Sequence, residues 1–313
     1  MPLAVATKVI DQTAYENSQG ADISRMEFGE NGDGFLNKHY VEIVRYARKK
    51  LPDCFLGMHT NFQHLTRDKA EILLGEGLIN RFSFNIDGAN PAQYFAVKRL
   101  ELNKVKDNVF DFLEVRQKTN ARVPLYMYVL TLNNYISAVT KGLGVYPSKI
   151  SDRGQLRVAD DYLEIRAFWS RYLNPVLGDS INRLPPCGIP ERNQFTPWKI
   201  DYSAYGCPQL ERLEHEAFIA PDGTWYACCI DTRTDLALGN LTTQSLRDIY
   251  FGKSRRTLID HLKNGRFLEV GPPCNTVNCC VELRCNETLT EQFEKVSYSL
   301  KRRTRRLMQR LGI

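Results

Sequence analysis

The hydrophobic residues in the first two thirds of the chain recur at two different spacings. Between residues 82 and 87 they alternate with polar residues, the period that puts successive side chains of a β-strand on opposite faces. Between residues 38 and 51 they return every three or four positions, which predicts a helix that ends at Pro52. The same reasoning predicts strands at 23–28, 54–60, 82–87, 123–130 and 179–182. It predicts helices at 38–51, 66–75 with Thr66 as N-cap, in one long stretch after Pro91, at 133–138 and at 160–173.

This alternation predicts an α/β fold, with a parallel sheet covered by helices. Because the carboxyl ends of parallel strands share one edge, the loops at 29–34, 60–61 and 87–88 should meet there. Three polar residues of one strand, Ser83, Asn85 and Asp87, share a face of that sheet. They would point into a ligand cavity if the sheet curls into a barrel, and the alternative is a solvated sheet face. No catalytic acid or base can be singled out.

The composition is that of a folded globular protein, with 43% hydrophobic and 25% charged residues. No apolar run approaches the roughly 18 residues of a membrane span, and the N-terminus does not resemble a secretory signal. The net charge is +6, of which residues 286–313 supply +4 from seven basic and three acidic side chains. This tail predicts a basic amphipathic helix, either docked on the protein or facing an anionic membrane surface or nucleic acid. The lack of interleaved aromatic residues argues against nucleic acid as a partner.

Seven of the nine cysteines fall between residues 207 and 285. The odd total, the adjacent Cys228-Cys229 pair and the lack of an export signal favour a reducing, cytoplasmic location over a disulfide framework. A hairpin turning at Pro221-Asp222-Gly223 should bring Cys228 beside Cys207, and the helix after Ser245 should return the chain toward Cys274. Such thiolates suit an iron–sulfur cluster or zinc, and buried cysteines without metal are the third possibility.

The segment 207–285 resembles a SPASM module, the C-terminal extension of many radical S-adenosylmethionine (SAM) enzymes. The resemblance rests on the cysteines, on the Pro221-Asp222-Gly223 turn, on Gly239-Asn240-Leu241 and on Ser245-Leu246 with Ile249. It implies one auxiliary 4Fe–4S cluster. The ligands implied are Cys207, Cys228, Cys274 and Cys279, with Cys229, Cys280 and Cys285 as alternates.

Residues 20–182 resemble the partial (β/α) barrel of radical SAM enzymes. Gly32-Asp33-Gly34 stands where that family has Gly-Glu-Pro, His59-Thr60-Asn61 matches the end of its third strand, and 82–88 matches its fourth. The residues implied for a SAM pocket are Gly32, Asp33, Thr60, Asn61, Ser83, Asn85 and Asp87. The chain departs from the family in having no cysteine before Cys54, and therefore no C-x3-C-x2-C motif for the SAM-cleaving cluster. We expect either a fragment or a degenerate member.

The domain organisation expected is a truncated barrel at 1–182, a linker at 183–206, the SPASM-like module at 207–285 and the basic helix at 286–313. The resemblance implies an enzyme that forms a 5′-deoxyadenosyl radical to modify a peptide, a protein side chain or a small molecule, with a reductase or other electron donor as partner. The alternative is a non-catalytic iron–sulfur or zinc module that recognises a peptide or protein.

Overall fold

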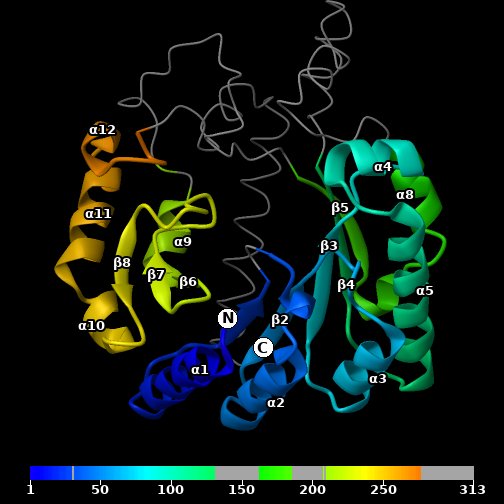
Figure 1. Ribbon diagram of the computed structural model, residues 1–313, viewed down its shortest axis with the longest axis horizontal. Helices are drawn as coiled ribbons and strands as arrows, with labels where there is room; N and C mark the ends of the chain where they lie inside the picture. Colours follow the sequence, from blue (N-terminus) through cyan, green and yellow to red (C-terminus); the bar gives the residue numbers. More distant parts are fainter. Residues whose placement is uncertain (30–31, 131–161, 185–206, 208, 276–313) are drawn as a thin grey trace, which may run out of the picture.

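The structure is a computed structural model that describes residues 1–29, 32–130, 162–184, 207 and 209–275 (Figure 1). The predicted helix at 133–138, most of the linker at 183–206 and the basic tail at 286–313 lie outside the described residues. Cys187, Cys279, Cys280 and Cys285 also lie outside them. Within the described part of the chain, no helix is both long and apolar enough to cross a bilayer.

A five-stranded sheet forms the larger part of the molecule. Its strands lie side by side in chain order, and every neighbouring pair is parallel. They are β1 (Arg25–Phe28), β2 (Phe55–His59), β3 (Arg81–Asn85), β4 (Leu125–Leu130) and β5 (Ser180–Leu184). All five were predicted from sequence, and the α/β class with a parallel sheet is confirmed.

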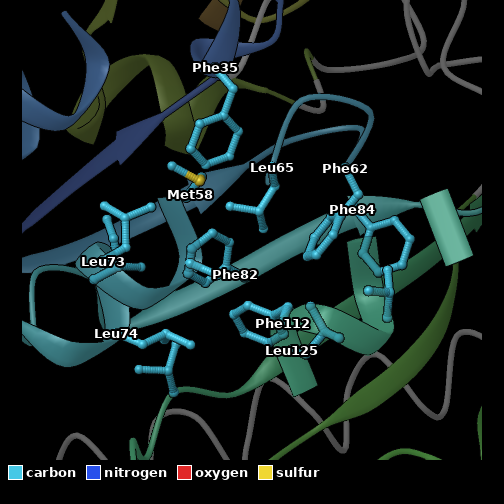
Figure 2. Packing of buried hydrophobic residues seen from close by; sticks show 14 of the residues in the cluster. Phe35, Met58, Phe62, Leu65, Leu73, Leu74, Phe82, Phe84, Phe112 and Leu125 are labelled. Carbon is cyan, nitrogen blue, oxygen red and sulfur yellow. The ribbon is translucent and has the colours of Figure 1, made fainter. Parts of the chain in front are cut away.

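Helices cover one face of this sheet, as helix crossovers between parallel strands require (Figure 1). They are α2 (Tyr40–Lys50), α3 (Arg67–Gly75), α4 (Pro91–Lys98), α5 (Leu102–Lys118) and α8 (Tyr162–Trp169). The core between sheet and helices is rich in aromatic rings: Phe62 packs against Phe82, Phe84 and Phe112, all fully buried (Figure 2). The alternation along β3 therefore sends phenylalanines to the helices and polar residues to the opposite face.

One local prediction for these helices was wrong. The long helix expected after Pro91 is two helices, α4 and α5, which are separated where Arg99 adopts a left-handed φ of 59°. Such a φ cannot continue a right-handed helix, and nothing in the helical spacing marks it. Thr66 occupies the N-cap position of α3, as predicted, although its side chain makes no capping hydrogen bond.

The first helix, α1 (Leu3–Ser18), has two occupied faces. Ala6, Ile10 and Thr13 are buried, and the first two belong to the core of the larger sheet. A neighbouring face contacts the C-terminal part of the chain, where Val9 packs against the cluster of Trp225, Leu241 and Ile249. α1 therefore lies beside α2 and beside α10 (Leu246–Tyr250) of the C-terminal part, at the lower edge of the view in Figure 1.

The C-terminal part is a small α+β unit. Strands β6 (Phe218–Ile219), β7 (Thr224–Tyr226) and β8 (Ala237–Asn240) form an antiparallel sheet. The first two make the predicted hairpin, and β8 was not predicted. The surrounding helices are α9 (Leu210–His215), α10 (Leu246–Tyr250), α11 (Lys253–Lys263) and α12 (Phe267–Val270). α10 begins as expected, with the Ser245 hydroxyl accepting a hydrogen bond from the Asp248 amide.

Candidate functional site: the carboxyl ends of the strands and a group of thiols

The loop after β1 meets the end of β2, as the strand order predicts. The Thr60 hydroxyl donates to the Asp33 carboxylate, at 3.2 Å from each oxygen, and the Phe35 amide donates to the same carboxylate at 3.0 Å. Asp33 also caps the short 3-10 helix η1 (Gly34–Leu36). Two predicted SAM-pocket residues, Asp33 and Thr60, are thereby brought into direct contact, and Gly32 directly precedes Asp33 in the loop after β1.

A glycine is required where this loop crosses β2. Gly29 has a φ of 92°, and a Cβ placed there would collide with the carbonyl oxygen of His59. Only a residue without a side chain fits both conditions. Asn61, in contrast, stabilises the turn in which it lies, because its side-chain oxygen accepts a hydrogen bond from the Gln63 amide at 2.9 Å.

His59 connects the polar residues of β2 and β3. The Ser83 hydroxyl lies 3.1 Å from both the Met58 carbonyl, to which it donates, and the His59 Nδ1. Because the hydroxyl proton is used on Met58, Nδ1 must carry the proton it shares with Ser83, which leaves Nε2 as an acceptor. Burial, and then the charge of Lys98, lower the pKa of His59 to about 4, although a hydrogen bond with the Asn85 side chain opposes this. The imidazole is therefore neutral at pH 7.

Asp87 is fully buried just beyond β3 and pairs with Lys98 of α4, at 2.7 Å between Nζ and Oδ2. Ser83 is also buried, so the alternative of a solvated sheet face is wrong for these two residues, whereas Asn85 is half-buried. Lys98 was missed in the sequence, because its place at this edge depends on the break between α4 and α5.

The polar face of the sheet continues toward the amino ends of the strands with residues that sequence reasoning also missed. The strand register puts Glu27 of β1, Gly57 of β2 and Arg81 of β3 at one level. Arg81 donates to Glu27 Oε1 at 2.7 Å, and Arg25 donates to the same oxygen at 2.6 Å. The signal that could have found Arg81 is its position two residues before Ser83 on the same strand.

Three of the four predicted cluster ligands share one neighbourhood in the C-terminal unit. Burial raises the pKa of Cys228 and of Cys274, and negative charge on neighbouring thiols raises both further. Cys207 acts on both of them, and Cys228 acts on Cys274. Asp231, buried in the turn after Cys228, adds to the same negative environment. The described thiols are thus grouped where unpaired negative charge is unfavourable, and a cationic metal group would offset it.

Cys229 has different surroundings from its neighbour Cys228. Its sulfur lies 3.3 Å from a guanidinium nitrogen of Arg212, whose side chain also pairs with Glu216 and stacks on Phe218. Among the described residues, no three His, Cys, Asp or Glu side chains converge on one point as ligands of a single metal ion would. The described cysteines therefore form a loose group rather than a closed site.

Comparison with known proteins gives one match in sequence and several in fold. Residues 207–286 match the SPASM family, described as an iron-sulfur cluster-binding domain. A comparison with curated proteins found no match.

The structure resembles solved radical SAM enzymes. BtrN in complex with AdoMet and 2-DOIA is 13% identical, with a TM-score of 0.50 over 88% of this chain and 79% of that one. anSMEcpe with bound AdoMet and the Kp18Cys peptide is 11% identical, with a TM-score of 0.53 over 96% of this chain and 91% of that one. At such identities the likeness establishes the fold alone. The chain therefore has a radical SAM-type fold with a C-terminal SPASM region, and the resemblance seen in the sequence is confirmed.

Proposed function

We propose that this protein binds SAM at the carboxyl ends of β1–β3 and holds one iron–sulfur cluster in its SPASM region. The observation that carries the proposal is the grouping of Cys207, Cys228 and Cys274 inside the matched segment. A bound cluster would supply electron transfer or a substrate-anchoring iron, the chemistry that the protein itself lacks.

The donor set favours a cluster over zinc. A single tetrahedral zinc needs its ligands to converge on one ion, with each sulfur about 2.3 Å from the metal. The described thiols do not converge in this way. Each iron of a 4Fe–4S cluster takes its own thiolate, so a looser group of thiols suits it. Cys279 is the expected fourth ligand, and Cys228 is favoured over Cys229, which is engaged by Arg212.

At the other site, the protein's own residues supply recognition. The Asp33 carboxylate, held by Thr60, would accept hydrogen bonds from the SAM ammonium group, while Asn85 and Gly32 would contact its polar groups. His59 is neutral at pH 7, so it adds no positive charge that would repel the sulfonium. The substrate class that we propose is a peptide, because anSMEcpe was solved with a peptide bound. BtrN was solved with 2-DOIA instead.

Anaerobic reconstitution tests the cluster. We expect about four irons per chain and absorbance near 400 nm, the signature of one 4Fe–4S cluster. Cys228→Ala and Cys274→Ala should lose most of the iron. Cys54→Ala is the matched control, because Cys54 is buried like Cys228 but lies immediately before β2. One zinc per chain without colour would reject the cluster, and full iron in Cys228→Ala would reject the ligand assignment.

Equilibrium binding tests the SAM site. Asp33→Asn and Thr60→Val should each weaken SAM binding about tenfold or more, since a charge-assisted hydrogen bond contributes about 1.5–3 kcal/mol. Asp68→Asn on α3 is the control, an acidic residue on the far side of the sheet. Equal affinity in all variants would place SAM elsewhere.

The second candidate function is a binding protein without radical chemistry. The observation in its favour is that residues 1–53 contain no cysteine to hold the SAM-cleaving cluster. Reduction with dithionite in the presence of SAM separates the two functions. Formation of 5′-deoxyadenosine would establish the enzyme, whereas SAM binding without turnover would establish the binding protein.

A further inference from the structure

The face of the large sheet opposite the helices carries a ladder of alternating cations and aromatic rings. The Arg25 guanidinium lies 5.0 Å from the centre of the Phe55 ring, and the Arg81 guanidinium lies 5.6 Å from the same ring. Arg81 also lies 5.1 Å from the Tyr126 ring. The ladder therefore crosses β1, β2, β3 and β4, and cation–π attraction holds both guanidinium groups in place.

One carboxylate serves both arginines, and the backbone of β2 makes room for it. Glu27 reaches from β1 across β2 to Arg81 on β3, and its carboxylate lies directly over Gly57. A Cβ at position 57 would collide with that carboxylate. Both arginines donate to the same oxygen, Oε1.

The charges of this group do not balance. Two guanidinium groups face one carboxylate, which leaves a net charge of about +1 beside Tyr126 and Tyr128. The side chain of Arg81 is 15% exposed and that of Glu27 is 27% exposed. Within the described part of the chain, the buried Nε of Arg81 has no hydrogen-bond partner. Arg81 thus keeps a donor, Nε, that an additional oxygen atom could use.

We propose that Arg25 and Arg81 bind an anionic group, a carboxylate or a phosphate, of the substrate. A planar guanidinium donates two parallel hydrogen bonds to such a group, and the stacked rings already fix its orientation. The Tyr128 phenol is a further donor, since burial raises its pKa and keeps it protonated. Glu27 then sets the strength of binding, because it competes with the ligand for the same donors. That the anion belongs to a substrate rests on the proposed function, whereas the binding of the anion does not.

Titration calorimetry at low salt with malonate and with inorganic phosphate tests the proposal and distinguishes carboxylate from phosphate. We expect the wild-type protein to bind at least one of them. Arg81→Met should weaken that binding at least tenfold. Arg81→Lys should weaken it less than Arg81→Met does, because lysine keeps the positive charge, although it lacks the two parallel N–H donors of a guanidinium. Arg67→Met is the control, since Arg67 pairs with Asp111 and Glu114 on the helical side of the sheet.

A second variant excludes a purely structural ladder. Glu27→Gln removes the competing negative charge, so it should tighten anion binding several-fold, whereas a structural role gives no tightening. Equal affinities in the wild-type protein, Arg81→Met and Glu27→Gln would overturn the proposal, as would a folded wild-type protein that binds neither anion. Iron content and SAM affinity are measured on the same samples. If the protein binds the cluster and SAM but no anion, only this inference is wrong. If it binds the anion but neither the cluster nor SAM, only the proposed function is wrong.

Discussion

Asp179 is the residue on which the last strand of the large sheet depends. Its two oxygens accept hydrogen bonds from Arg116 at 2.7 and 2.8 Å, and they also accept from the amides of Leu125 and Asn174. Arg116 donates in addition to the Val123 carbonyl. Both charged side chains are buried, so the pair joins the C-terminal part of α5 to the starts of β4 and β5.

Breaking this pair should be costly. Asp179→Ala leaves the Arg116 charge buried without its carboxylate, and we expect the free energy of unfolding to fall by about 3–5 kcal/mol. Urea denaturation measures the change. Asp111→Ala is the control, because the ion pair that it removes is solvent-exposed and its loss should be small by comparison. Equal losses in the two variants would contradict this account.

His59 predicts a pH dependence of stability. Its pKa is about 4 in the folded protein, below the ordinary value of 6.5. Between these values the unfolded chain binds a proton that the folded protein does not, so the contribution of His59 is fully present above about pH 6.5 and is lost as the pH falls toward 4. His59→Gln should flatten the stability profile in this window, measured by urea denaturation from pH 7 to 4.5. A profile unaltered by His59→Gln would show that His59 protonates in the folded state.

At the scale of elements, α1 attaches the SPASM region to the large sheet. The Gln12 side chain donates to the Leu241 carbonyl at 2.8 Å and accepts from the Leu246 amide at 2.6 Å. Lys8 reaches the Thr242 carbonyl, and Glu16 pairs with Arg247 at 3.4 Å. These residues, spaced four apart, lie on one side of the helix and contact the segment that leads from β8 into α10.

Gln12→Ala should loosen this contact without unfolding either part. It removes two short hydrogen bonds to backbone groups, together with a longer one to the Gln244 carbonyl at 3.4 Å. The three are worth together about 1–3 kcal/mol. Hydrogen exchange should therefore become about 5- to 100-fold faster at the amides of residues 241–250, while the strands of the large sheet keep their protection. Gln19→Ala, just past the end of α1, is the control. If exchange in 241–250 does not change, the helix does not hold the region.

The sequence predicted elements better than it predicted their contacts. Alternation along 82–87 was sufficient for β3 and for its buried and polar faces, and turn chemistry was sufficient for the hairpin at 221–223. The break at Arg99 had no sequence signal, since a left-handed residue other than glycine or asparagine is rare. The ladder around Arg81 and the role of Gln12 depend on which strands and helices become neighbours. Spacing along the chain does not contain that information.

At the scale of the whole molecule, the two parts differ in the size of their cores. Behind the large sheet lies one continuous core, whereas the described part of the SPASM region has three small clusters, among them Phe218 with Tyr226 and Trp225 with Leu241. Small cores stabilise little by themselves, and small units commonly depend on a metal. The grouped thiols of Cys207, Cys228 and Cys274 are where we expect a metal group to stabilise the SPASM region.

Removing the cluster should therefore affect the two parts unequally. After chelation of iron from the reconstituted protein, we expect faster hydrogen exchange across 209–275 and little change in β2, β3 and β4, because metal binding stabilises only the state that holds the ligands together. Cys228→Ala prepared without iron should behave like the chelated protein. Uniform loosening of both parts would mean that the cluster stabilises the whole chain.

The two occupied faces of α1 also determine how the chain can be divided. A fragment beginning near Cys207 would expose the apolar surface of Trp225, Leu241 and Ile249 that Val9 covers, and the backbone groups that Gln12 satisfies. A fragment limited to the matched residues 207–286 would thus expose apolar surface and tend to aggregate. A peptide of residues 1–20, supplied in trans or fused ahead of residue 207, is the natural remedy. By sequence position α1 belongs to the N-terminal half, but its side chains pack in the cores of both the large sheet and the SPASM region.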